Sequence, residues 1–481
     1  MSSVTNPVID QSVIPKTIQN FKVLIQNFES IDLDIETNHL NITELVSEVS
    51  MFESIFKAFI HGFITVIDNS GIISSMPLIG QEKLLIQWEK DARLYQKVFY
   101  TVNIFDVRAI NDQTITYGIE FTQEKQLKNT VSLFSKSYKD TAHGIIQSVY
   151  DNFLANSQIP ESRLDVRIES KSKHGVTFPY MKPLKAIDMI MKNTLAIDGT
   201  PMLLFETFYG EEGNLSGRPI LSSYADLYTA DPIPNVVIRP KQIARDSSDP
   251  EADYRATIFT HNFTQNYSTL DMLSRGAFGA GSTVIDLSVM SAKMRGFSFR
   301  EPFGSGAPPI ANDWISDRYR IEVEKERLQA HQIWSTRNIT VFENKYAYED
   351  DEYPTIYGTD LYDRQILNSY MIRSRTALLS VYMDAITTIK AGDTIETTLP
   401  TYFPKTEDIA TDDSKTQDLI NSGKFLVASV RHYIKNREYT ISAELIRDGI
   451  GQGANLYPDR SPVFNDPIEV PTLIQLDGDG G

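Results

Sequence analysis

The sequence predicts a mainly β protein of the α+β class, and three observations predict it. Between residues 20 and 125, short stretches of alternating apolar and polar residues follow one another with turn residues between them. From about residue 138 the apolar residues recur every three or four positions, which predicts helices. After about residue 380 the alternating stretches resume. Short strands in immediate succession are typical of antiparallel barrels and sandwiches.

The N-terminal strands are predicted where apolar residues alternate with polar ones: Phe21 to Ile25, Ile31 to Ile35, Leu84 to Trp88 and Ile115 to Phe121. Turn-forming residues separate them, namely Asp68-Asn69-Ser70-Gly71, Gly80 and Asn111-Asp112. Glycine and the short polar residues favour the backbone conformations that tight turns need. We therefore expect these residues to form exposed turns between strands.

Three helices are predicted in the remainder of the chain. The first carries Ile145, Val149 and Phe153, with Asp140 or Thr141 as its N-cap. The second starts at Pro183 and places a set of apolar residues on one face: Leu184, Ile187, Ile190, Met191 and Leu195. The third covers about 361–380, with Tyr362, Ile366 and Tyr370 on one stripe. The glycine-rich stretch 276–282 (GAFGAGS) is interpreted as a loop.

A weak internal repeat links the two ends of the chain. Gly80 opens a strand, and Val107-Arg108 then leads through a turn into the strand 115–121. Gly392 likewise opens a strand, and Val430-Arg431 leads through Asn436 into the strand 439–445. Two unrelated hairpins could look alike by chance. If the repeat is real, the chain contains two related antiparallel barrels.

Composition and charge limit the kinds of function that the chain can have. There are no cysteines, so neither disulfides nor thiolate chemistry can occur. The net charge is −17, which argues against specific binding of a nucleic-acid backbone. We expect no secretory signal, because the N-terminus has no basic start followed by an apolar run. We also expect no membrane span, because no stretch of about 18 unbroken apolar residues occurs.

No pattern of residues predicts catalysis. The seven histidines do not occur in pairs with metal-ligand spacing, so we predict no metal site and no cofactor. The acidic run 349–352 and the glycines of 276–282 are better explained as solvated or loop segments than as paired catalytic acids or a phosphate loop. We therefore predict that the protein is not an enzyme.

The order of several motifs resembles that of a known protein family. The motifs are Glu53-Ser54 and GFITVIDNSGIISSMPLIGQEKLLIQW, then IEFTQEKQLKNTVSLFSKSYKDTAHGIIQSVYDNFL and GVTFPYMKPLKAIDMIMKNTLAIDGTPMLLFETFYG, and finally ALLSVYMDAITTIKAGDTIETTLP and GKFLVASVRHYIKNREYTISAELIRDGI. In this order the chain resembles the central baseplate hub proteins of contractile-tailed phages, including the T-even hubs and the related hubs of type VI secretion and contractile injection systems. The resemblance extends over about residues 20–450.

This resemblance implies a division of the chain into parts. They are an N-terminal arm (1–19), a first barrel (20–125), a helical or mixed domain (126–231 with 291–377), a discontinuous second barrel (232–290 and 378–455) and a C-terminal tail (456–481). The segments 294–360 and 404–422 would be insertions.

The resemblance also implies an assembly and its partners. Three chains would form a ring that joins the spike protein to the tail tube or a tube-initiator protein, with baseplate wedge proteins around it. DNA would pass through the channel without specific binding. The protein would lie in the baseplate of the virion tail, after assembly in the host cytoplasm.

Interface residues can be proposed only among exposed turns, and the candidates are Asp68, Asn69, Ser70, Gly71, Asn111, Asp112 and Asn436. Two other classes of function stay open at this point. One is a tail-associated cell-wall hydrolase, and the other is a receptor-binding tail protein.

Overall fold

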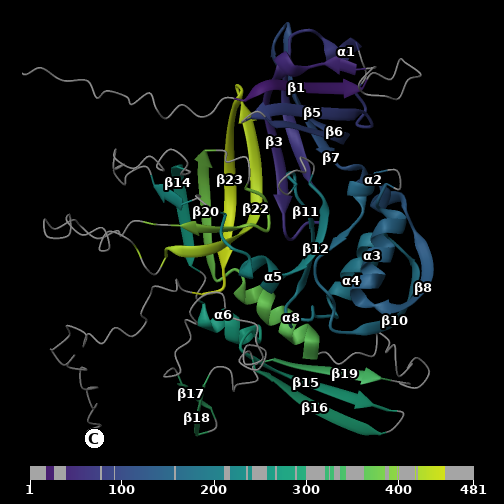
Figure 1. The fold of residues 1–481 in the computed structure, drawn as a ribbon, viewed down its shortest axis with the longest axis vertical. Coiled ribbons are helices and arrows are strands. Elements are labelled where there is room, and N and C mark those ends of the chain that lie inside the picture. The colour runs from purple at the N-terminus through teal and green to yellow at the C-terminus, as the bar shows by residue number, and fades with distance from the viewer. Residues whose placement is uncertain are drawn as a thin grey trace, which may run out of the picture.

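The computed structural model describes residues 18–26, 39–75, 78–90, 93–156, 159–210, 217–233, 237–240, 257–265, 268–287, 290–298, 320–323, 325–329, 336–342, 362–384, 389–397, 399, 418 and 421–449. The predicted N-terminal arm (apart from Ile18 and Gln19), most of the segment 404–422 and the tail 456–481 lie outside these ranges. Within them the fold is mainly β, as predicted, and most strands belong to one thirteen-stranded sheet (Figure 1).

Two groups of six strands make up most of this sheet. The first unit consists of β1 (Gln19–Gln26), β3 (Val46–Ser54), β4 (His61–Asp68), β5 (Lys83–Lys90), β6 (Arg93–Asn111) and β7 (Thr114–Thr122). The second unit consists of β13 (Val237–Pro240), β14 (Thr257–Gln265), β20 (Ala377–Asp384), β21 (Thr394–Thr397), β22 (Gly423–Lys435) and β23 (Glu438–Arg447). The short β2 (His39–Asn41) extends the first unit beyond β1, and η1 (Thr43–Leu45) connects β2 to β3.

The two units have the same strand order. The first runs β1-β5-β6-β7-β4-β3, and the second runs β13-β21-β22-β23-β20-β14. In the second unit β13 also pairs with β14, whereas the described pairings of the first unit form an open series. The strands of the units are antiparallel except at β13, which is parallel to both of its neighbours. The prediction of two related antiparallel barrels is thus met in strand order, while closure of both barrels stays a prediction.

The register confirms the repeat and corrects its alignment. In β6 a bulge separates Thr101, opposite Phe121, from Asn103. In β22 a bulge separates Val427, opposite Leu445, from Ser429. The strands 115–121 and 439–445 therefore correspond as predicted.

The two Val-Arg pairs, in contrast, do not correspond. Arg108 lies opposite Thr116, whereas Arg431 lies opposite Ser442, the counterpart of Gly118. A second bulge between Phe105 and Arg108 lengthens β6, and it displaces the sequence match.

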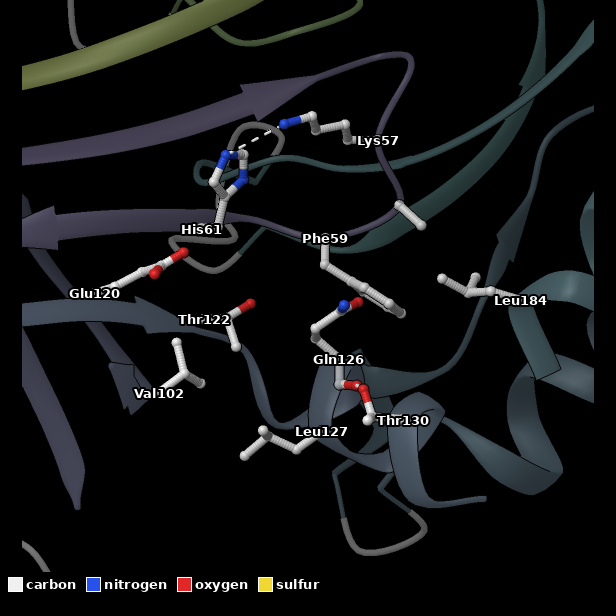
Figure 2. A pocket seen from close by; sticks show the side chains of 11 residues that line it. Lys57, Phe59, His61, Val102, Glu120, Thr122, Gln126, Leu127, Thr130 and Leu184 are labelled. Atoms are coloured by element: carbon white, nitrogen blue, oxygen red, sulfur yellow. Dashed lines mark hydrogen bonds between the residues drawn. The ribbon is translucent and has the colours of Figure 1, made fainter. Parts of the chain in front are cut away.

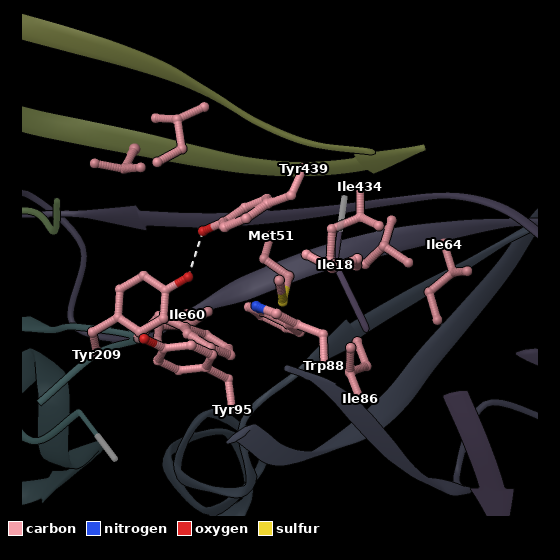
Figure 3. Packing of buried hydrophobic residues seen from close by; sticks show 14 of the residues in the cluster. Ile18, Met51, Ile60, Ile64, Ile86, Trp88, Tyr95, Tyr209, Ile434 and Tyr439 are labelled. Atoms are coloured by element: carbon pink, nitrogen blue, oxygen red, sulfur yellow. Dashed lines mark hydrogen bonds between the residues drawn. The ribbon is translucent and has the colours of Figure 1, made fainter. Parts of the chain in front are cut away.

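The units are joined edge to edge. β22 pairs with β3 from Ser429 opposite Ser54 to Lys435 opposite Glu48. Figure 1 shows the yellow hairpin β22–β23 beside β3. Since β-sheet side chains alternate between faces, one face of both units contributes to a single buried cluster that includes Trp88, Met51 and Tyr439. Figure 3 shows Trp88, Tyr95, Tyr209 and Tyr439 meeting in this cluster.

A smaller α/β part packs beside the first unit. It contains α2 (Glu124–Val131), β8 (Phe134–Thr141), α3 (Ala142–Phe153), η2 (Pro160–Ser162), β9 (Asp165–Val166), β10 (Lys173–Met181), α4 (Pro183–Met191), β11 (Met202–Glu206), β12 (Pro219–Ser223) and α5 (Tyr224–Thr229). The helices α3 and α4 confirm two predictions, and Thr141 caps α3 by accepting the Gly144 N–H. Leu195 lies beyond the end of α4, in a bridge with Pro201.

A third group of elements covers the other end of the second unit. It comprises α6 (Thr269–Ser274), β15 (Gly279–Asp286), β16 (Ser291–Ser298), β17 (Arg320–Val323), β18 (Glu326–Gln329), β19 (Thr336–Phe342) and α8 (Tyr362–Arg373). The short α1 (Ile72–Ser75) does not belong to this group and follows β4 in the first unit. The expectation of a loop at 276–282 is met at 276–278 but was wrong for 279–282, because Gly279 begins β15. The third predicted helix ends at Arg373 instead of about residue 380.

Candidate functional site

The predicted interface turn 68–71 is divided between a buried and an exposed part. Asp68 is 2% exposed, and its carboxylate accepts the N–H groups of Ser70 (2.9 Å) and Ile73 (3.0 Å). Burial by itself would raise the pKa of Asp68, but the backbone N–H groups around it hold that pKa below its usual value. Asp68 therefore shapes the turn, and of its four residues only Asn69, Ser70 and Gly71 are exposed to solvent.

The other predicted turns are hairpin tips. The side chain of Asn111 accepts the Gln113 N–H (2.9 Å) at the exposed β6–β7 turn, which contains Asp112. Asn436 has φ of +51° in the β22–β23 turn, a conformation that asparagine tolerates. Asp68 pairs with Ile115, just after the first tip. The pairing order therefore places all three turns at the same end of the strands of the shared sheet. Their role as contacts stays a prediction.

A buried polar cluster that sequence reasoning missed fixes the junction between the units. Glu53 of β3 is 2% exposed, and its carboxylate accepts the N–H groups of Ala391 (2.7 Å) and Phe208. Its Oε1 lies 3.6 Å from His432 Nε2, and His432 Nδ1 lies 2.7 Å from the Tyr439 hydroxyl. One carboxylate thus bonds two loops beside the β3–β22 pairing. The only sequence signal was the position of Glu53, which follows Val49 and Met51 at alternate positions of β3 and therefore lies on the apolar face of the strand.

Each unit also has a glycine-carboxylate loop at its bulge. In the first unit, Gly80 has φ of +80°, and the Glu82 carbonyl accepts the Thr101 N–H (2.9 Å). In the second unit, Gly392 has φ of +92°, and the Asp393 carbonyl accepts the Val427 N–H (2.8 Å). The two loops bind the same position of the two hairpins, which adds a second element to the repeat.

The two carboxylates of these loops are bound differently. Glu82 accepts the N–H groups of Ile79 (2.7 Å), Gly80 (3.1 Å) and Gln81 (3.0 Å), and these bonds with the Thr101 hydroxyl outweigh the effect of burial and lower its pKa. Asp393 accepts the Lys390 N–H (2.9 Å), and burial raises its pKa to about 7. Both carboxylates hold their loops through these bonds.

A second buried charge cluster joins the first unit to the α/β part. Glu206 of β11 is bonded by Lys97 of β6 (3.0 Å), by Lys125 of α2 (2.8 Å) and by the Gln123 amide (2.6 Å). Although burial alone would raise the pKa of Glu206, the two ammonium groups lower it to about 2. Glu206 is therefore ionised at neutral pH, and its bonds to β6 and α2 fix the position of β11.

A pocket of about 560 Å³ opens between β4, β6, β7, α2 and α4. Figure 2 shows Lys57, His61 and Glu120 on one side of it and Leu127 and Leu184 on the other. Lys57 Nζ lies 3.3 Å from His61 Nε2, and burial together with the Lys57 charge lowers the pKa of His61. Across the described ranges, no group of three His, Asp or Glu side chains is arranged to hold a metal ion. No described helix has the length and apolar character needed to cross a membrane.

Comparison with known proteins gives similarity to structures only. No protein-family model matches the chain, and no curated protein matches it. A tail protein from Neisseria meningitidis matches with 8% identity over 90% of this chain and 98% of that chain, at a TM-score of 0.48. The 43 kDa tail protein of prophage MuSo2 from Shewanella oneidensis matches with 8% identity over 89% and 99%, at 0.46.

A third similar structure is an E. coli component of the type VI secretion system, which is described as structurally similar to two T4 tail proteins. It is 8% identical and covers 84% of this chain and 73% of that chain, at a TM-score of 0.40. The chain is similar to tail and type VI secretion proteins. These are the classes of protein that its sequence resembles.

Proposed function

We propose that the chain is a structural hub protein of a contractile phage tail, located in the baseplate of the virion. The observation that carries the proposal is the repeat of strand order, bulge and glycine-carboxylate loop in the two units. A chain with two similar units gives six similar units when three copies assemble around an axis. Such a ring can contact a threefold partner on one side and a sixfold partner on the other.

In this proposal the threefold partner is the spike and the sixfold partner is the tail tube or its initiator. The exposed residues Asn69, Ser70, Gly71, Asn111, Asp112 and Asn436 form contacts with these partners or with the baseplate wedges. All of them lie at the same end of the sheet's strands, which supports a contact on one side of the ring. Asp68 is better assigned to supporting the turn, since its carboxylate is bonded internally.

The chain's charge suits a channel for DNA. A net charge of −17 repels phosphate groups, so DNA would pass through the ring without specific binding. Two closed barrels, a trimeric ring and assembly in the host cytoplasm are all parts of this proposal.

Low-resolution electron microscopy of the purified chain tests the proposal. We expect rings with a central hole and six similar lobes. A zymogram on bacterial cell wall provides the second arm, and we expect no clearing. Single compact particles without a hole, or clearing that depends on one internal carboxylate, would contradict the hub.

A further inference from the structure

The β3–β22 junction within the chain has a counterpart that the described chain leaves unpaired. The pairing register identifies the strand that corresponds to each partner of this junction. Phe121 lies opposite Gly62, which lies opposite Met51 of β3, and Leu445 lies opposite Leu379, which lies opposite Phe263 of β14. Thus β14 corresponds to β3. The bulges show equally that the part of β6 after Asn103 corresponds to the part of β22 that pairs with β3.

The outer arm of β6, defined as residues 103–111, has one strand neighbour. In the described chain it pairs only with β7, because the pairing of β5 with β6 ends at Tyr100. In β22 the corresponding stretch is covered by β3, and Arg431, the counterpart of Phe105, is only partly exposed. The outer arm instead exposes apolar side chains: Phe105 (38%), Val107 (55%) and Ile110 (58%). An open strand edge with exposed apolar residues is a template for pairing with another chain.

The edge of β14 has a similar opening. β14 pairs with β20 along its length but with β13 only at Thr257 and Ile258. Further along, Thr260, Asn262 and Thr264 are exposed. The two partners of the missing junction, β14 and the outer arm of β6, are thus present on opposite units of one chain. A head-to-tail contact between such surfaces on different copies closes into a ring when the rotation allows it.

We propose that the outer arm of β6 in one copy pairs antiparallel with β14 of a second copy, with Phe105 opposite Thr264. This register follows from Arg431 opposite Phe52 within the chain, because Phe105 is the counterpart of Arg431 and Thr264 is the counterpart of Phe52. The contact between copies then reproduces the contact between units, and each copy supplies one edge of each kind. The inference rests on the proposed ring and identifies the strands that close it.

Disulfide trapping tests the register directly, since the natural chain has no cysteine. A disulfide requires Cα atoms about 4.4–6.8 Å apart, which opposite residues in a strand pair meet. The full-length variant F105C/T264C should form covalent dimers and trimers on mild oxidation. A mixture of the two single variants should give dimers at most. In the control F105C/T260C, the second cysteine lies about 13 Å further along the strand, so no trimer should form.

The effect of a surface charge on assembly gives a second measurement. Val107→Lys should reduce trimer formation at least tenfold, because it places an ammonium group in the proposed contact. Val131→Lys changes another exposed valine (78%) at the end of α2 and should leave assembly unchanged. A trimer by mass that F105C/T264C does not cross-link, or that tolerates Val107→Lys, overturns this pairing and leaves the ring intact. A chain that stays monomeric at high concentration overturns the proposed function as well.

Discussion

Two buried carboxylates, Glu206 and Asp393, show how single residues hold the parts of the chain together. Glu206 compensates two lysines that are 16% and 12% exposed. Removal of one partner from a buried ion cluster leaves uncompensated charge, which typically costs several kcal/mol. Among the described residues, no salt bridge to Asp393 is observed. Its carboxylate accepts the Lys390 N–H, and burial raises its pKa.

Glu206→Gln should lower the free energy of unfolding by about 3–5 kcal/mol at neutral pH, as measured by urea denaturation. The matched control is Asp188→Asn, which removes an exposed i,i+4 pair with Lys192 and should cost less than about 0.5 kcal/mol. Because the folded pKa of Glu206 is near 2, its contribution is present above pH 4.5 and is lost as pH falls towards 2. Equal losses in both variants would refute the cluster's role.

Asp393→Asn should change the pH dependence of stability. The folded pKa of Asp393, about 7, lies above the unfolded value of 3.8, so its stabilising contribution is present below pH 4 and is lost as pH rises through 7. Relative to Asp393→Asn, the natural chain should lose about 1–3 kcal/mol between pH 5 and pH 8 in denaturation series. Parallel curves for the two proteins would show that Asp393 does not titrate in this range.

At the scale of elements, the sequence predicts those whose apolar spacing is regular. Helix α3 was predicted from Ile145, Val149 and Phe153, and the first two are fully buried. Helix α2 was missed because it is short and mostly polar, with Leu127 and Val131 as its two apolar residues, and none of its residues is buried. Helix α8 was predicted too long, because the buried residues of 377–383 alternate along a strand instead of following the helical period.

The loops before β5 and β21 depend on glycine for two reasons. Gly80 and Gly392 both have positive φ, and an added Cβ would lie 3.1 Å from the Val102 backbone and 3.0 Å from the Phe205 ring. Gly71 also has positive φ, but nothing lies within 4 Å of such a Cβ. Alanine at Gly71 should therefore cost about 1 kcal/mol, from the backbone alone. Alanine at Gly80 or Gly392 should cost clearly more in urea denaturation, and equal costs at all three positions would contradict the repeated loop.

At the scale of the whole molecule, local patterns predicted the hairpins but not their connection. The strands 115–121 and 439–445 were predicted to correspond, and the register agrees. The edge-to-edge contact of β3 with β22 joins residues almost 400 positions apart in sequence, and no local pattern encodes such a pairing. For the same reason Glu53 was noted as part of a motif, while its bonds to Ala391 and Phe208 were not foreseen.

The mass of the purified chain in solution tests the central claim most directly. If two similar units per chain build a ring, sedimentation equilibrium at micromolar concentration should give three times the chain mass of 54.4 kDa. The Val131→Lys variant should give the same mass. A mass of 54.4 kDa that persists at the highest attainable concentration would contradict the hub proposal, provided that circular dichroism shows the chain to be folded.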